Sequence, residues 1–165
     1  MDYYLLTEDE RVKQPLKFNS QLFGNEKDDI VIQCDITKNT LYVDYVQARQ
    51  HIDVCSLISE KVKNIILSYD REICFFGVFI TSMNLETQLI YWRFDMNTIK
   101  TINKDRLDKE IIISLADIGA EEVLFRVASK TQEFIVLRED LAESIMRRKP
   151  LGIKFKKLDT PEVSK

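Results

Sequence analysis

The chain has 165 residues, of which 45% are hydrophobic and 31% charged, and a formal net charge of −3. These values predict one globular domain over residues 1–165 and exclude an intrinsically disordered chain. The longest apolar run, Ile73–Ile80, is too short to cross a bilayer, and Met1–Glu8 lacks the basic and long apolar regions of a secretory signal.

The first third of the chain is predicted to form strands. Tyr3–Leu6 resembles a short strand, and the polar residues 7–29 then form a long surface connection. Apolar and polar residues alternate in Ile30–Cys34 and again in Leu41–Tyr45. We expect these two strands to pair as a hairpin closed by Asp35–Thr40.

The clearest helix signal begins at Ser59. Its hydroxyl can accept a hydrogen bond from the first turn, and Glu60 would lie near the positive end of the helix dipole. The apolar stripe that follows has helical spacing and consists of Val62, Ile65, Ile66 and Tyr69.

Strands are predicted after this helix. Ile73–Ile80 is apolar on both faces, as in a central strand. In Ile90–Met96 the alternation places Trp92 on the apolar face and Tyr91 on the solvent face. Residues 97–120 are ambiguous, with one helical turn possible near Lys104–Glu110.

The last third reads as a hairpin, a helix and a strand. Val123–Val127 and Glu133–Leu137 are expected to pair. A helix over 139–148 would follow, acidic in its first turn and basic at its end, and would bury Leu141, Ala142, Ile145 and Met146. Ile153–Phe155 forms the last strand, and residues 158–165 are expected to be a flexible tail.

Two segments of the chain repeat each other at an offset of 79 residues. Five positions match, namely Ile58 with Leu137, Glu60 with Glu139, Val62 with Leu141, Ile66 with Ile145 and Phe76 with Phe155. Each copy is an apolar step, an acidic helix start, an amphipathic helix and a strand. The predicted fold class is therefore α+β, with mostly antiparallel sheets, two or three helices and two similar strand–helix–strand segments.

Residue chemistry gives little support for catalysis. His51 is the only histidine, and with Asp53 it offers two ligands where a stable metal site needs three or four. The chain has no phosphate-binding glycine loop and no nucleophile elbow. The three cysteines, Cys34, Cys55 and Cys74, form no C-x-x-C pair and favour free thiols in a reducing cytoplasm. We expect no catalytic, cofactor-binding or metal-ligating residues, although a pair of carboxylates meeting in space stays open.

Charge is unevenly distributed along the chain. Residues 1–60 carry 11 acidic and 6 basic side chains, which argues against nucleic-acid binding there and suits a basic protein partner. The candidate partner-binding residues are Glu8, Asp9, Glu10, Asp28, Asp29 and Tyr91. The basic residues between Arg147 and Lys157 are better explained as a helix end and a solvated edge strand than as a phosphate-binding surface.

Five segments of the chain together carry a family resemblance, namely Tyr3–Leu6, Ile58–Ile66, Leu124–Val127, Phe134–Leu141 and Leu151–Phe155. With these segments the chain resembles immunity-protein family eleven of bacterial polymorphic toxin systems. The chain departs from the family pattern at Arg138, where the family often has Ser or Thr before the acidic start of the last helix. The resemblance implies a non-catalytic immunity-type domain that binds and neutralises a cognate protein toxin, with no catalytic residues to carry over.

Two other functions stay open. The chain is an adaptor or regulatory binding module of a phage or mobile element if its basic C-terminal edge binds a partner. It is an unrecognised enzyme if His51, Asp53 and further carboxylates meet in one pocket.

Overall fold

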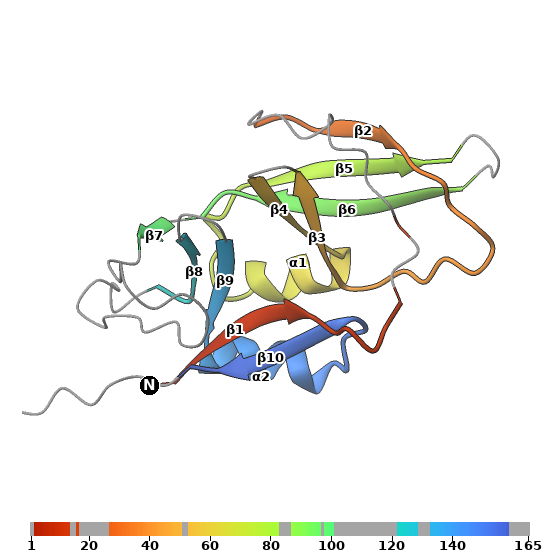
Figure 1. Ribbon diagram of the computed structural model, residues 1–165. Helices are drawn as coiled ribbons and strands as arrows, with labels where there is room; N and C mark the ends of the chain where they lie inside the picture. Colours follow the sequence, from red (N-terminus) through yellow and green to blue (C-terminus); the bar gives the residue numbers. More distant parts are fainter. Residues whose placement is uncertain are drawn as a thin grey trace, which may run out of the picture.

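The structure is a computed structural model that describes residues 2–13, 16, 27–50, 53–82, 87–96, 98–100, 122–128 and 133–158. Its elements are β1 (Tyr3–Glu8), β2 (Ile30–Gln33), β3 (Tyr45–Gln50), β4 (Asp53–Ile58), α1 (Glu60–Leu67), β5 (Phe75–Thr81), β6 (Gln88–Phe94), β7 (Thr98–Lys100), β8 (Leu124–Ala128), β9 (Glu133–Arg138), α2 (Glu139–Arg147) and β10 (Ile153–Lys157). They form two five-stranded sheets, which are ordered β10-β1-β9-β8-β7 and β2-β5-β6-β4-β3 (Figure 1).

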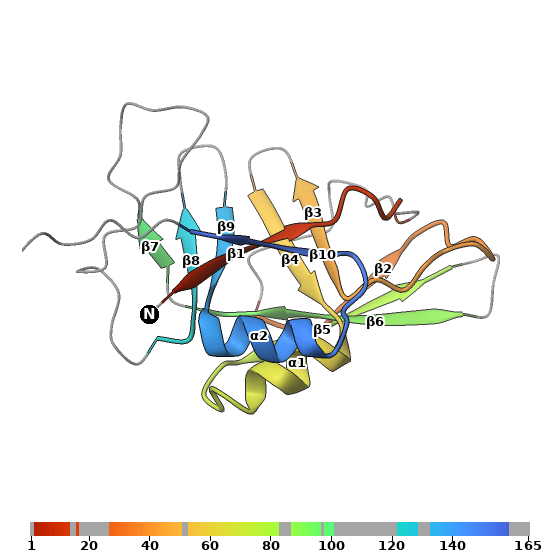
Figure 2. The ribbon, with the colours of Figure 1, turned by 90° about the horizontal axis from the view of Figure 1, so that it is seen from below.

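The α+β class is confirmed. The described residues contain two helices, and all strand pairs are antiparallel except β2–β5 and β7–β8. Figure 2 shows α1 and α2 side by side. They are joined where the Tyr69 hydroxyl donates to the main-chain oxygen of Asp140 at 3.0 Å and also contacts the Ser144 hydroxyl. The possible helical turn near Lys104–Glu110 lies outside the described residues, as does the tail beyond Leu158.

Each helix belongs to a split β-α-β unit. Helix α1 connects β4 to β5, and β6 lies between these two strands and is antiparallel to both. Helix α2 connects β9 to β10, and β1 lies between them in the same way. The strand β1, from the start of the chain, therefore completes the C-terminal unit.

The two units match in register as well as in topology. Tyr45 pairs with Ile58 in the β3–β4 hairpin, and Leu124 pairs with Leu137 in the β8–β9 hairpin. Both residues of the second pair lie 79 positions after their counterparts in the first. The sequence repeat thus continues to the first strand of each unit.

After the helices the offset changes by one residue. Trp92 pairs with Ile58 and Gly77, and Tyr4 pairs with Leu137 and Lys157, so Gly77 corresponds to Lys157. Phe155 is therefore the counterpart of Phe75, and its predicted match with Phe76 is wrong. The connection that follows α2 is in effect one residue longer than the one that follows α1.

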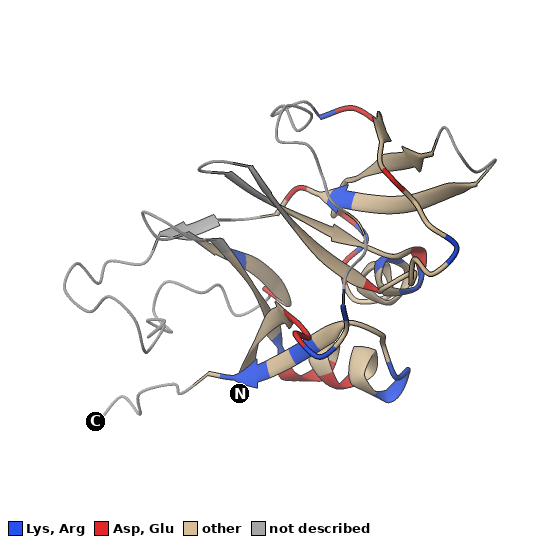
Figure 3. Cartoon of the chain, turned by 45° about the vertical axis from the view of Figure 1, so that its right-hand side comes forward, with Lys and Arg blue, Asp and Glu red and all other residues tan. Residues whose placement is uncertain are grey.

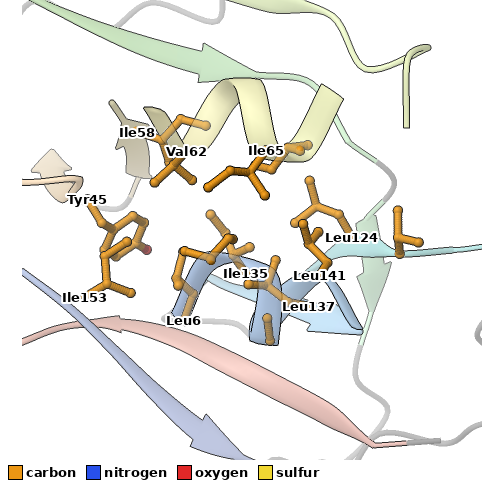
Figure 4. Packing of buried hydrophobic residues seen from close by; sticks show 14 of the residues in the cluster. Leu6, Tyr45, Ile58, Val62, Ile65, Leu124, Ile135, Leu137, Leu141 and Ile153 are labelled. Atoms are coloured by element: carbon orange, nitrogen blue, oxygen red, sulfur yellow. The ribbon is translucent and has the colours of Figure 1, made fainter. Parts of the chain in front are cut away.

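One hydrophobic core joins the two units. It lies between the helices and the sheets, and counterparts from both units occur in it (Figure 4). The buried pairs are Tyr45 with Leu124, Ile58 with Leu137, Val62 with Leu141, Ile66 with Ile145, and Phe94 with Leu6. Two smaller apolar clusters, one around Tyr91 and one around Tyr3, lie on the opposite faces of the two sheets.

Both helices begin as the sequence predicts, although their caps differ. The Ser59 hydroxyl accepts a hydrogen bond from the Val62 amide at 3.3 Å. Arg138 occupies the cap position of α2 and makes no side-chain cap; instead its guanidinium binds the Asp140 carboxylate at 2.8 and 2.9 Å. The buried stripes of Val62, Ile65 and Ile66 and of Leu141, Ala142 and Ile145 are confirmed, whereas Tyr69 is exposed and Met146 is only partly buried.

The predicted hairpin between Ile30–Cys34 and Leu41–Tyr45 is wrong. The turn forms, since the Thr40 amide donates to the Thr37 carbonyl at 3.0 Å, but the segments on either side do not pair. β2 pairs in parallel with β5, and β3 begins at Tyr45 and pairs with β4. The β3–β4 hairpin was not predicted. The predicted β8–β9 hairpin is confirmed.

Candidate interaction surface

The acidic candidates at the end of β1 are partly engaged within the chain. A carboxylate oxygen of Glu8 accepts a hydrogen bond from the Gln47 amide on β3 at 2.6 Å. Asp9 accepts two bonds from the Arg11 guanidinium, at 2.9 and 2.8 Å, and these lower its pKa to about 2. Glu10 is exposed. The carboxylate of Glu8 thus binds the main chain of β3 at the edge of the second sheet.

Asp28 and Asp29 lie at the opposite edge of that sheet, just before β2. The Asp29 carboxylate accepts a hydrogen bond from the Gly77 amide at 2.5 Å, and the Arg93 guanidinium donates to the Asp28 carbonyl at 2.7 Å. Both residues are exposed. Four strand spacings separate this edge from β3, roughly 19 Å at the usual 4.8 Å spacing. The two acidic groups therefore do not form one surface.

The predicted exposure of Tyr91 is wrong, because its side chain is 0% exposed. The ring lies 5.0 Å from that of Tyr42 and packs in the cluster on the far side of the sheet from α1, and this burial raises the pKa of its hydroxyl. Alternation identifies one buried face only when the other meets water, and here the face of β6 that carries Tyr91 is covered by a second apolar cluster. Its counterpart Tyr3 is buried in the same way.

Exposed apolar side chains occur instead on the α1 side of β2, β5 and β6. Val31, Phe79 and Ile90 are direct neighbours across these strands, and we call them the apolar row. Val31 is 67% exposed and Ile90 is 38% exposed, while Phe79 is partly buried. Figures 1 and 2 show that these three strands extend beyond the end of α1. The row is exposed because the helix does not reach it.

Local contacts hold the apolar row in place. A β-carbon on Gly77 would lie 2.9 Å from Cε2 of Phe79, so the Phe79 ring lies against the Gly77 backbone. The Tyr42 hydroxyl donates to the Ile90 carbonyl at 2.6 Å and so holds the main chain at the β6 end of the row, while the Tyr42 ring packs against Tyr91. Nearer the helix, the Lys63 ammonium lies 3.4 Å from the centre of the Trp92 ring and covers it.

A buried polar junction joins the two units, and sequence reasoning missed it. Asp44 is buried, and its carboxylate accepts from the Ser59 hydroxyl at 2.6 Å and from the Leu151 amide at 2.7 Å. The Lys61 ammonium is 3.7 Å away. The Asp44 amide also donates to the Leu151 carbonyl at 2.7 Å. These bonds fasten the start of β3 and of α1 to the connection between α2 and β10, which is a structural role.

The basic C-terminal residues divide into two groups. On α2 the guanidinium of Arg147 binds Glu143 at 2.7 Å, and that of Arg148 donates to the Ser144 carbonyl at 2.8 Å. On β10, which forms an edge of its sheet, Lys154 and Lys156 are exposed (Figure 3). This arrangement agrees with a helix end and a solvated edge strand.

The side chains of His51 and Asp53, the candidate metal ligands, lie outside the part of the chain that the structure describes. Among the described residues, no three histidine, cysteine, aspartate or glutamate side chains are grouped to hold a metal ion. No helix in the same ranges has the length and apolarity to span a bilayer.

The chain was also compared with known proteins. No protein-family model matches it, and no curated protein matches it significantly.

Proposed function

We propose that this chain is a non-catalytic immunity protein that binds a cognate bacterial toxin in the cytoplasm and neutralises it by occlusion. The observation that carries the proposal is the apolar row of Val31, Phe79 and Ile90 on strands that extend past α1. Contiguous exposed apolar side chains on a soluble domain are characteristic of protein-binding sites. The resemblance to immunity-protein family eleven supplies the kind of partner.

The row has the composition expected at the centre of such an interface. Binding energy is usually concentrated in a few aromatic and aliphatic anchors surrounded by polar residues. Here the row contains the aromatic Phe79 between the aliphatic Val31 and Ile90, and the polar Gln33, Thr81 and Gln88 form the next row across the same strands. A standard interface would bury about 800 Å² on each partner, so the contact would extend beyond these residues.

The proposal is tested by co-expression with a candidate toxin encoded beside this gene. We expect protection of the cell and a complex that survives purification. Replacing both Val31 and Ile90 with serine should weaken the complex at least tenfold and remove protection, with little change in thermal stability because both side chains are exposed.

A control variant is available within the chain. Leu151 is 41% exposed, close to the exposed fraction of Ile90, but lies outside the row on the connection to β10. Leu151→Ser should leave binding and protection unchanged. The proposal fails if the wild-type protein neither protects the cell nor forms a complex with the toxin.

A second candidate function is an adaptor or regulatory module of a phage or mobile element. It is favoured by Lys154 and Lys156, which are exposed on the edge strand β10 and add positive charge near the end of α2. Retention on DNA that decreases steeply with salt would support it, provided that Lys154→Glu and Lys156→Glu abolish retention. Salt-independent elution from the DNA would exclude this candidate.

A further inference from the structure

The edge of β2 has features that identify the kind of segment it can accept. Among the described strands, β2 has a neighbour on one side only, β5. The Cys34 amide donates to the Thr81 carbonyl at 3.0 Å, so the even-numbered residues of this segment point their main-chain groups at β5. By the alternation of a parallel strand, Val31 and Gln33 direct their N–H and C=O groups outward.

Val31 contributes both an exposed apolar side chain and outward-facing main-chain groups. Its side chain lies on the α1 side of the sheet at one end of the apolar row, while its main-chain groups face away from β5. A strand added beside β2 would therefore place an alternate side chain next to Val31. The apolar row would then continue across four strands in place of three.

Charge at the two ends of β2 restricts the partner. Asp28 and Asp29 precede the strand, and Asp35 follows it two residues after Gln33. All three are exposed. Lys27 is neutralised by an ion pair with Asp95 at 2.9 Å, and Lys38 lies in the turn that follows. The Arg93 guanidinium, which donates to the Asp28 carbonyl at 2.7 Å, offsets one of the two negative charges before the strand and leaves the other. The edge therefore has an apolar centre between two acidic ends.

This charge pattern disfavours a second copy of the chain. An antiparallel pairing of β2 with itself would bring Asp29 of one copy near Asp35 of the other, and like charges facing each other across strands are destabilising. A segment with an apolar centre and basic ends would have complementary charges at both ends. We propose that the cognate partner adds such an extended segment to the edge of β2 that faces away from β5. This inference rests on the proposed function and specifies the contact.

The first experiment uses a defined peptide and the whole protein. The peptide has a centre of alternating threonine and valine and two lysines at each end. We expect it to protect the amides of Val31 and Gln33 from hydrogen exchange. A peptide with glutamates in place of the lysines should bind about tenfold more weakly at low ionic strength, and the difference should decrease with added salt.

Two substitutions at one position separate edge pairing from simple apolar contact. Val31→Pro removes the outward N–H and leaves the bonds of β2 to β5 in place, whereas Val31→Thr keeps the N–H and nearly the same shape. Peptide binding should be lost in Val31→Pro and retained in Val31→Thr. Equal binding by both variants would overturn the proposal, as would protection that maps to β10.

The same amides are then followed in the complex with the toxin. Protection of Val31 and Gln33 in that complex supports the inference. A complex that protects the cell but leaves these amides exposed overturns the inference and leaves the proposed function standing. If the peptide binds at β2 but the protein neither protects the cell nor forms a complex with the toxin, the proposed function fails and the pairing at the edge of β2 stands. Concentration-dependent dimers that protect the same amides without peptide would identify a second copy as the occupant and also overturn the inference.

Discussion

Gly152 provides a quantitative test of how the two units are joined. Its φ is +79°, in the region that side chains disfavour, and a β-carbon there would lie 2.8 Å from Cβ of Val43. The backbone on both sides is fixed, because the Leu151 amide binds the Asp44 carboxylate at 2.7 Å and the Gly152 carbonyl accepts from the Asp9 amide at 3.1 Å. The backbone therefore cannot easily shift to relieve the clash between an added methyl group and Val43.

The expected cost of Gly152→Ala has two parts. The left-handed conformation costs a residue with a β-carbon about 1–2 kcal/mol. Forcing a β-carbon against the buried Val43 costs about 1–3 kcal/mol, as for overpacking generally. The sum is about 2–5 kcal/mol, which corresponds to a decrease in melting temperature of roughly 5–15 °C for a domain of this size. Urea denaturation followed by circular dichroism, with equal slopes for both proteins, measures the difference in free energy.

Gly77→Ala is the matched control. Its β-carbon would also be too close to a neighbour, at 2.9 Å, but that neighbour is Cε2 of Phe79, the outer end of a partly exposed ring. The ring can move, and the φ of Gly77 is not positive, so the loss should stay below about 1 kcal/mol. Equal losses at the two glycines would refute the reasoning about the fixed backbone at Gly152.

Two further predictions concern the helices. Ile66→Ala and Ile145→Ala truncate counterpart side chains in one core, and each should lower the free energy of unfolding by about 2–5 kcal/mol; losses below about 1 kcal/mol at both would contradict the observed packing. The Arg138 guanidinium lowers the pKa of Asp140 below its usual 3.8. Since the folded-state pKa is depressed, the ion pair contributes to the free energy of unfolding above about pH 4. That contribution is lost as the pH falls through the lowered pKa. Asp140→Asn should therefore reduce the decrease in stability measured by urea titrations between pH 4 and pH 2, and an unchanged profile would count against the ion pair.

The elements that the sequence predicts correctly depend on neighbours along the chain. Ser59 and the stripe after it specify α1, and the short connection after Ala128 specifies the β8–β9 hairpin. The pairings of β1 with β9 and of β2 with β5 join segments far apart in sequence. No local pattern determines their register, which is why the predicted partner of β2 was wrong.

The candidate site depended on long-range packing in the same way. Whether a residue on β6 is exposed follows from where α1 ends and from what covers the opposite face. The sequence pattern therefore placed Tyr91 on the solvent face and Ile90 on the apolar face, whereas in the structure Tyr91 is buried and Ile90 is exposed. The sequence repeat does not reach these strands; the correspondence between Tyr91 and Tyr3 follows from the pairings of β6 and β1, and both residues occupy the face opposite the helix in their units.

The chain order of the two units suggests a rearrangement that the protein should tolerate. The first unit runs β3-β4-α1-β5-β6, whereas the second runs β8-β9-α2-β10 and takes its final strand, β1, from the N-terminus. The Leu158 amide donates to the Tyr3 carbonyl at 2.9 Å, so the end of β10 lies beside the start of β1, as the end of β5 lies beside the start of β6. A short connection could therefore join them.

Moving residues 1–13 to follow Lys165 would place β1 directly after β10 and give both units the same order. The residues after Leu158 would serve as the connecting loop, whose closure adds little entropy cost at that length. We expect this permuted protein to fold with a free energy of unfolding within about 2 kcal/mol of the parent, because all the sheet pairings are kept. A control with the same junction but opened between Val78 and Phe79, inside β5, should not fold, since it cuts an interior strand. If the first permutant also failed to fold, folding would require β1 at its present place in the chain. The correspondence between β1 and β6 would then be one of geometry alone.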